Sequence, residues 1–158
     1  MAQSTTSIAT HSGSTKQRSK ASGRRESSPY ISIAETRALL ADSFATRQAR
    51  LDSDEMITTD QAAALVGTNR VTINSWISNG RAIGLTQTKR GLKLPMWQFE
   101  QRVWDVLPEL SHALGTNEGW ALLSFLETPH GAFQGASPLL MIERGQSKRV
   151  LKVAAGEG

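Results

Sequence analysis

The chain has 158 residues, which is enough for one domain or two small ones. It contains no cysteine, so disulfides, thiol nucleophiles and cysteine-based zinc sites are excluded. The net charge of +4 is unevenly spread: residues 1–29 and 56–94 each carry five basic residues and one acidic residue, while 30–55 and 95–158 are mildly acidic. Basic segments attract phosphate and release counterions, so those two segments are the candidates for nucleic-acid contact.

The first segment, residues 1–29, is rich in Ser and Thr and contains almost nothing apolar to bury, which predicts a disordered tail. Such a composition also suits an organelle transit peptide, but the segment lacks a clear amphipathic stripe. We therefore favour a solvated tail that adds nonspecific affinity for phosphate. The basic residues of this tail are Lys16, Arg18, Lys20, Arg24 and Arg25.

Residues 30–55 predict one helix, from about Ile33 to Arg50. Ser32 and Glu35 form a capping-box pattern at its start. Leu40 and Phe44 recur at helical spacing and give the helix an apolar face. Two roles for that face remain open, packing within the chain's own domain or forming a homodimer.

Residues 56–95 predict two short helices around a tight turn. Thr58 and Gln61 form a second capping signal for a helix over 59–66, and Gly67 suits the left-handed turn that follows. We expect Thr68 to cap the second helix, which ends near Ser78. Apolar residues of the second helix should pack on the first helix, namely Ile73, Trp76 and Ile77 against Ala63, Leu65 and Val66.

This packing leaves polar side chains of the second helix pointing outward, where they suit base edges in a DNA groove. Those side chains are Asn69, Arg70, Thr72 and Asn74. Residues 83–94 then alternate well enough to predict a basic hairpin that contacts the DNA backbone or minor groove. Its candidate contacts are Arg81, Lys89, Arg90 and Lys93. For Asn69 and Asn74, a capping or plain surface role is the alternative.

The stretch MITTDQAAALVGTNRVTINSWISNGRAIGL, followed by KRGLKLPMWQF, resembles the winged helix-turn-helix of the MerR/excisionase-like group. The shared pattern is a T-x-x-Q-A-A-x-L-x-G start, a T-I/V-x-x-W second helix and a wing that ends in P-x-W. The resemblance implies binding to double-stranded DNA. The cysteine metal ligands and the long C-terminal coiled coil of MerR-type sensors are absent from the sequence.

Residues 96–158 predict a small helical domain, and the chain as a whole is expected to be mainly α. A long helix should begin at Pro95 and kink or split at Pro108. We expect Thr116 to cap a helix that runs to about Leu126. Ser137 and Pro138 begin a short helix that ends at Gly145, and a last helix covers about 148–155.

This C-terminal part resembles the toxin-binding domain of the Xre/MbcA/ParS antitoxin family. The matching positions are Trp120, Phe125, Leu126, Pro129, Phe133, Gly135, Ser137, Pro138, Leu139 and Gly145. The resemblance implies an antitoxin of a type II toxin–antitoxin system that neutralises a partner toxin, often RES-like, and represses its own operon. It also implies that polar residues near the C-terminus reach the toxin, here Arg149, Lys152 and Glu157. Many members of that family carry an all-helical reader instead of a wing.

The apolar run 139–142 exceeds what one short helix usually buries, so Leu139, Met141 and Ile142 are candidates for the partner-binding surface. No arrangement of His112 and His130 suits zinc or a catalytic triad, and phosphate loops are absent. We therefore expect no enzyme activity, no cofactor, no metal and no membrane partner, and a cytoplasmic, nucleoid-associated protein. The alternative function is an excisionase-like or architectural DNA-binding regulator without a toxin.

Overall fold

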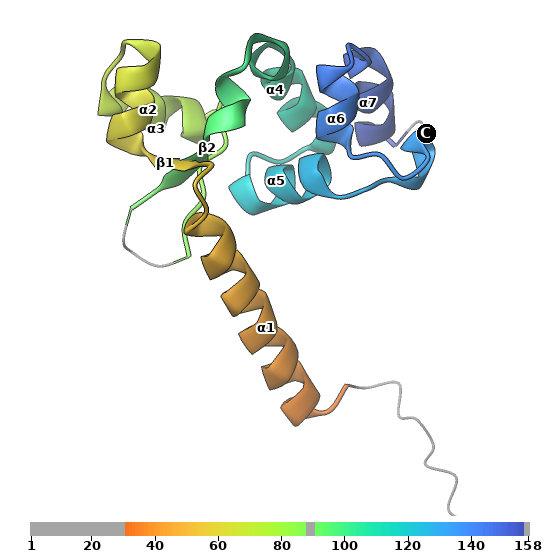
Figure 1. Cartoon of the computed structure of the whole chain (residues 1–158). Coiled ribbons are helices and arrows are strands. Elements are labelled where there is room, and N and C mark those ends of the chain that lie inside the picture. Colours follow the sequence, from red (N-terminus) through yellow and green to blue (C-terminus); the bar gives the residue numbers. More distant parts are fainter. Residues whose placement is uncertain (1–30, 88–90, 157–158) are drawn as a thin grey trace, which may run out of the picture. The chain divides into compact units, whose positions relative to one another are not determined.

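The structure is a computed structural model that describes residues 31–87 and 91–156. In these residues the chain is mainly helical with one small two-stranded antiparallel sheet, as the sequence predicts. Figure 1 shows the elements in chain order. They are α1 (Ile33–Leu51), β1 (Met56–Thr58), α2 (Thr59–Val66), α3 (Arg70–Ser78), β2 (Lys93–Pro95), the 3-10 turn η1 (Met96–Phe99), α4 (Gln101–Leu114), α5 (Gly119–Glu127), the 3-10 turn η2 (Gly131–Phe133), α6 (Pro138–Glu143) and α7 (Ser147–Ala154). The predicted disordered tail at 1–29 lies outside the described residues.

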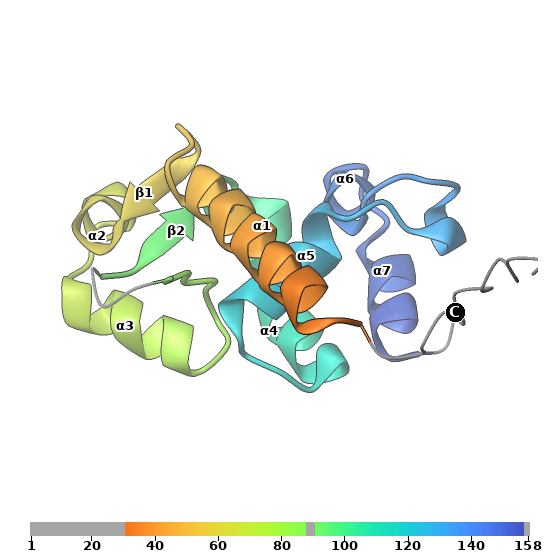
Figure 2. The ribbon, with the colours of Figure 1, turned by 90° about the horizontal axis from the view of Figure 1, so that it is seen from below.

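Contacts group the chain from Ile33 onward into one compact unit. Within it, α2, α3 and the sheet lie together on one side, and α5, α6 and α7 lie on the other, with α4 next to both groups (Figure 2). The residues predicted as a winged helix-turn-helix and those predicted as a C-terminal helical domain therefore belong to one compact unit.

Helix α1 has the predicted bounds to within one residue, but only its C-terminal end packs on the rest of the unit. Leu51 is its one buried residue. Arg50 hydrogen-bonds and pairs with Glu127 of α5 and also pairs with Glu55 at 3.0 Å. The hydrogen bond to Glu127 raises the pKa of Arg50 above its ordinary value, although partial burial opposes this. Of the two roles expected for the apolar face, packing within the chain's own domain applies to the last turns of α1 but not to its N-terminal half.

The start of α2 and the turn after it follow the sequence signals. The hydroxyl of Thr58 accepts from the N–H of Gln61 at 3.1 Å, and the Gln61 side chain accepts from the N–H of Thr58 at 2.8 Å, so the capping box is confirmed. Gly67 has φ 72°, the left-handed conformation expected of it. The predicted cap of the next helix is wrong, because Asn69 and not Thr68 accepts from the N–H of Thr72 at 2.9 Å.

Of the predicted strand pair within 83–94, the described residues show β2 and one antiparallel bridge. Strand β2 pairs with β1, with Ile57 opposite Leu94, and Leu85 contributes only a single bridge to Lys93. The reason is that Ile83 turns into the core. Its backbone N–H and C=O bond to a side chain instead of to a strand, so no ladder can extend past Leu85.

That side chain belongs to Gln98 of η1, which is fully buried. Gln98 Oε1 accepts from the N–H of Ile83 at 2.7 Å, and Nε2 donates to the Ile83 carbonyl at 3.0 Å. Both polar groups of a buried backbone unit are therefore satisfied by one amide. This bidentate contact holds the segment after α3 against η1.

Two hydrophobic clusters form the interior. The α2–α3 cluster contains Ala62, Ala63, Ile73 and Leu94, with Ile57, Trp76, Ile77 and Phe99 packed against it. The larger C-terminal cluster joins buried residues of α4 to α7 with Leu51, Met56, Ile83 and Leu85. The predicted packing of Leu65 and Val66 is wrong, because they are 55% and 37% exposed. Leu65 and Val66 stay exposed because α3 contacts α2 through Ala62 and Ala63 instead.

The expected long helix from Pro95 begins as the turn η1 and continues as α4, with the break at Glu100. Pro108 does not split the helix, since α4 runs through it. Proline lacks the N–H that would bond to the carbonyl four residues earlier, which is that of Trp104. Arg81 Nη1 donates to this carbonyl at 2.6 Å, so the bond that Pro108 omits is replaced from outside the helix.

The last helices match the predicted order. Glu118 caps α5, because its carboxylate accepts from the N–H groups of Trp120 and Ala121, so the prediction of Thr116 as the cap is wrong. Ser137 caps α6 through the N–H of Leu140 at 3.2 Å, as expected. Amphipathic helix α7 closes the C-terminal cluster through Val150, which is fully buried.

The junction of α3 with α4 depends on a glycine. Gly80 has φ +72°, and a Cβ there would lie 2.2 Å from Ser111 Oγ. We expect Gly80→Ala to lower the free energy of unfolding more than Gly115→Ala, by ~1–3 kcal/mol, because only Gly80 adds overpacking to left-handed strain. Gly115 is the matched control, with φ +65° and open space around its Cβ position. Urea unfolding would measure both, and equal losses would contradict the packing account.

Candidate nucleic-acid interface

The solvent-facing side of α3 is polar and basic at its N-terminal end. Ile73 is fully buried and fixes the helix on α2, and Trp76 and Ile77 are half-buried on the same side. Arg70 and Asn74 are exposed on the same helix, and Thr72 is half-buried. The structure thus leaves Arg70 and Asn74 accessible, two of the α3 residues that the sequence singles out.

Two of these residues have partners that limit what they can offer. Asn69 uses its side-chain oxygen as the cap of α3, which leaves its amide N–H groups for a ligand. Arg70 Nη1 lies 3.7 Å from Asp60 Oδ2, and the two side chains are 63% and 72% exposed. An ion pair this exposed is worth little, so a phosphate or base edge can displace it.

Sequence reasoning missed Val71. It is 78% exposed on α3, directly beside Arg70. An apolar side chain there has no role in the core, and apolar contact is how proteins read the methyl group of thymine. The available signal was its place between two polar residues in the first turn of the helix, away from the period of Ile73 and Trp76.

Arg81 has a structural role beside this surface. Its guanidinium lies 4.0 Å from the centre of the Trp104 ring and donates to the Trp104 carbonyl. Trp104 in turn contacts Trp76 edge-on, at 5.2 Å between ring centres. Arg81 thus stabilises the junction of α3 with α4, and its contact with DNA stays a prediction.

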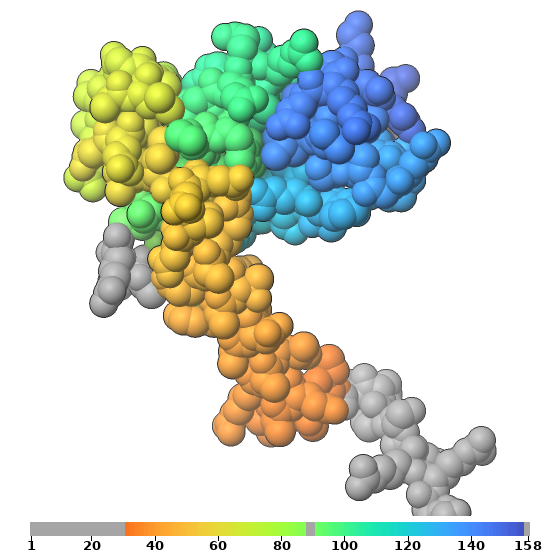
Figure 3. Space-filling model, in the orientation of Figure 1, coloured from red at the N-terminus to blue at the C-terminus, as the bar shows by residue number. Residues whose placement is uncertain are grey.

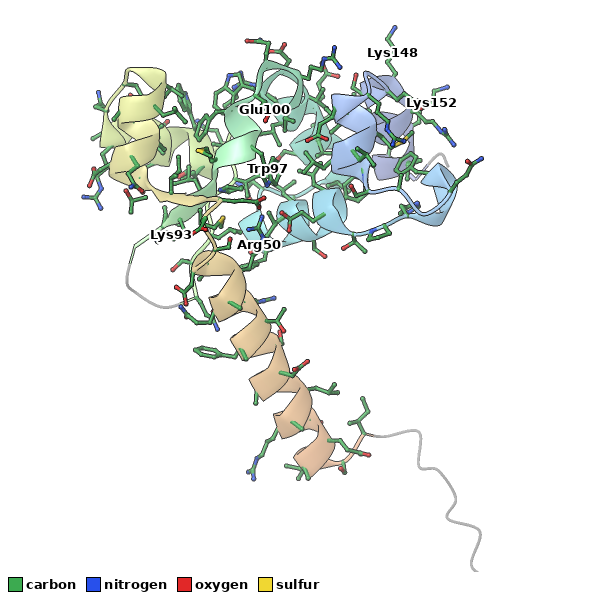
Figure 4. All side chains as sticks on the ribbon, in the orientation of Figure 1. Arg50, Lys93, Trp97, Glu100, Lys148 and Lys152 are labelled. Carbon is green, nitrogen blue, oxygen red and sulfur yellow. The ribbon has the colours of Figure 1, made fainter. Side chains whose placement is uncertain are left out.

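Of the basic residues predicted in the hairpin, the structure places only Lys93. It is half-buried at the start of β2, and its backbone N–H and C=O bond to Leu85 at 2.9 and 2.7 Å (Figure 4). Lys89 and Arg90 lie outside the described residues. The basic contribution of this loop to the interface therefore stays a prediction.

The predicted partner-binding residues divide into two groups. Met141 and Ile142 are 4% and 1% exposed, so their prediction as surface contacts is wrong: α6 turns them into the C-terminal cluster. Leu139 is half-buried, and Lys152 is exposed on α7. Arg149 is exposed but donates to the Ala132 carbonyl. Glu157 lies outside the described residues.

No family model, curated protein or solved structure matches the chain. Across residues 31–87 and 91–156, no group of His and acidic side chains is arranged to hold a metal ion. Within the same residues, none of the helices has both the length and the apolar character needed to cross a bilayer. The surface of α3 and the resemblances in the sequence are therefore the features that point to a function.

Proposed function

We propose that this protein is a DNA-binding antitoxin that binds operator DNA through a winged helix-turn-helix and neutralises a partner toxin through its C-terminal helices. The observation that carries the DNA part is the exposed end of α3. Arg70, Val71 and Asn74 face solvent at the N-terminal half of a helix whose other side is held by a fully buried Ile73. Side chains in this part of a second helix are the ones that reach base edges.

The charge of the segment supports the same proposal. Residues 56–94 carry five basic residues and one acidic residue, Asp60, which already pairs with Arg70. An approaching phosphate therefore meets little opposing charge from this segment. Lys89 and Arg90 of the proposed wing precede β2 in the sequence, and β2 contacts α2.

The toxin-binding part is supported by the resemblance of residues 120–145 and by the surface of α7. Leu139 keeps part of its side chain at the surface, and Lys148 and Lys152 are exposed on α7 (Figure 4). A toxin that contacts this face would present acidic groups to the two lysines. Repression of its own operon follows as part of the same proposal, because one protein would join operator and toxin.

The DNA part is tested by titration against a set of operator-length duplexes at fixed salt. We expect Arg70→Ala to weaken binding to the preferred site by ~1–3 kcal/mol, which is the value of a bidentate contact with guanine. Lys152→Ala is the control, since that exposed lysine lies on α7 and should leave DNA affinity unchanged. An unchanged footprint for Arg70→Ala would rule out its reading role.

The toxin part is tested by capture from the native host, with the full chain as bait followed by mass spectrometry. A small protein retained by the wild type and lost with Lys148→Glu plus Lys152→Glu would support the antitoxin. Recovery of DNA alone, together with bending of the bound site, would favour the excisionase-like regulator instead.

A further inference from the structure

Helix α1 carries an apolar stripe that the described residues leave more than half exposed. Ile33, Leu40 and Phe44 recur at spacings of seven and four, so they share one face, and they are 74%, 64% and 53% exposed. The helix is about 28 Å long from its 19 residues and is attached only at its C-terminal end. Figure 3 shows the N-terminal half of α1 standing away from the packed body in that view.

A helix of this kind gains little from its own unit. Isolated helices shorter than about 12–15 residues are marginal in water, and most helix stability in proteins comes from burial of an apolar face. The part of α1 from Ile33 to Phe44 has no buried residue. The exposed stripe therefore calls for a partner surface.

The same chain has a groove with matching properties. The groove has a volume of about 520 Å³, and it lies where α2 ends beside η1. Leu65, Val66 and Met96 are exposed around it, and the acidic side chains of Glu55 and Glu100 complete its rim; its other lining residues are Trp97 and Phe99. Apart from Val71, the large apolar side chains exposed in residues 31–87 and 91–156 gather in two places, this groove and the α1 segment.

The charges of the two surfaces are complementary. Arg37 lies three residues before Leu40 and so borders the stripe of α1. Glu100 lies on the rim of the groove, and among residues 31–87 and 91–156 no basic one lines that groove. Glu55 already pairs with Arg50, so Glu100 is the acidic group left to meet an incoming arginine. A second copy of the same stripe facing α1 directly would instead bring two sets of arginines together.

The groove also lies next to the C-terminal end of α1. The Glu55 carbonyl accepts from the N–H of Met96 at 2.8 Å, and Glu55 pairs with Arg50 in the last turn of α1. If two copies lie antiparallel, the N-terminal half of each α1 therefore lies near the C-terminal end of the other copy's α1, where the groove is. Such an exchange is closed by two-fold symmetry, because each copy gives one helix and one groove.

We propose that this protein forms a two-fold dimer in which the stripe Ile33–Leu40–Phe44 of each α1 fills the groove between α2 and η1 of the other copy. Arg37 of one copy pairs with Glu100 of the other. The proposal concerns self-association alone, and it stands or fails without DNA or a toxin.

The first experiment is sedimentation equilibrium of the full chain in the absence of DNA. We expect a dimer whose dissociation constant rises at least tenfold with Leu40→Glu and likewise with Leu65→Glu. Leu39→Glu is the matched control, because Leu39 is 58% exposed but about 100° around the helix from Leu40. Circular dichroism of each variant checks that the fold is retained.

The second experiment separates exchange from direct pairing of two α1 helices. The chain has no cysteine, so single cysteines introduced as Leu40→Cys and Met96→Cys can be joined by a short bismaleimide. We expect a covalent dimer only when the two variants are mixed. Arg37→Glu should weaken the dimer, and Arg37→Glu combined with Glu100→Arg should restore it.

Three outcomes would overturn the proposal. The first is a wild-type chain that stays monomeric at tens of micromolar. The second is a dimer that Leu65→Glu leaves intact. The third is efficient cross-linking of Leu40→Cys with itself, which would place the two α1 helices against each other.

Discussion

Replacing Gln98 by Leu is expected to lower the free energy of unfolding by roughly 2–6 kcal/mol. The substitution removes the partners of two buried backbone groups, the N–H and the C=O of Ile83, at about 1–3 kcal/mol each. Ile83 and Gln98 are both fully buried, so the orphaned groups stay inside the core. Leucine fills similar space, which keeps the change one of hydrogen bonding instead of packing.

The measurement is urea unfolding followed by tryptophan fluorescence, and the control is the same chemical change at an exposed glutamine. Gln101 of α4 is exposed, and its amide contacts Asp105 one turn later. Gln101→Leu should change stability by less than ~0.5 kcal/mol. Equal losses for the two variants would show that the amide of Gln98 contributes nothing specific.

Replacing Arg81 by Met is expected to cost ~2–5 kcal/mol of stability. A hydrogen bond from a charged donor is worth about 1.5–3 kcal/mol, and stacking of a guanidinium on an indole adds about 0.5–2 kcal/mol. Arg81 makes both contacts with the same residue, Trp104. Methionine keeps the apolar stem of the side chain, so the loss reports the guanidinium.

The role of Pro108 can be tested by adding the helical N–H that it lacks. In Pro108→Ala, the new N–H can bond to the Trp104 carbonyl within α4. Arg81→Met should then cost less by ~1 kcal/mol or more, measured as a double-mutant cycle of unfolding free energies. If the two substitutions are additive, the guanidinium does not replace the missing bond of Pro108.

The features that the sequence predicts well are those that depend on near neighbours. The capping box of Thr58 and Gln61, the left-handed Gly67 and the Ser137–Pro138 start of α6 each involve residues within a few positions. Short-range rules describe such contacts because the groups are held together by the local backbone. The polar face of α3 was predictable for the same reason, since the burial of Ile73 sets the direction of Asn74.

The caps of α3 and α5 are displaced by only one and two residues, whereas the larger corrections involve contacts between distant segments. Arg81 looks like a phosphate contact from its neighbours, and only the carbonyl of Trp104, 23 residues later, shows its structural use. Met141 and Ile142 look like a surface patch on a short helix until α4, α5 and α7 cover them. The predicted hairpin is reduced to one bridge because the Gln98 side chain hydrogen-bonds to the backbone of Ile83. No local pattern encodes these pairings.

The turn η1 has a consequence for how the chain unfolds. Trp97 packs against the C-terminal cluster, Phe99 packs against the α2–α3 cluster, and the residue between them holds the backbone of Ile83. Neither cluster can unfold without disturbing η1, which also packs against the other cluster. Calorimetry should therefore record a single melting transition whose van't Hoff and calorimetric enthalpies agree. A partner that binds to α4–α7 would then also change the temperature at which α3 unfolds.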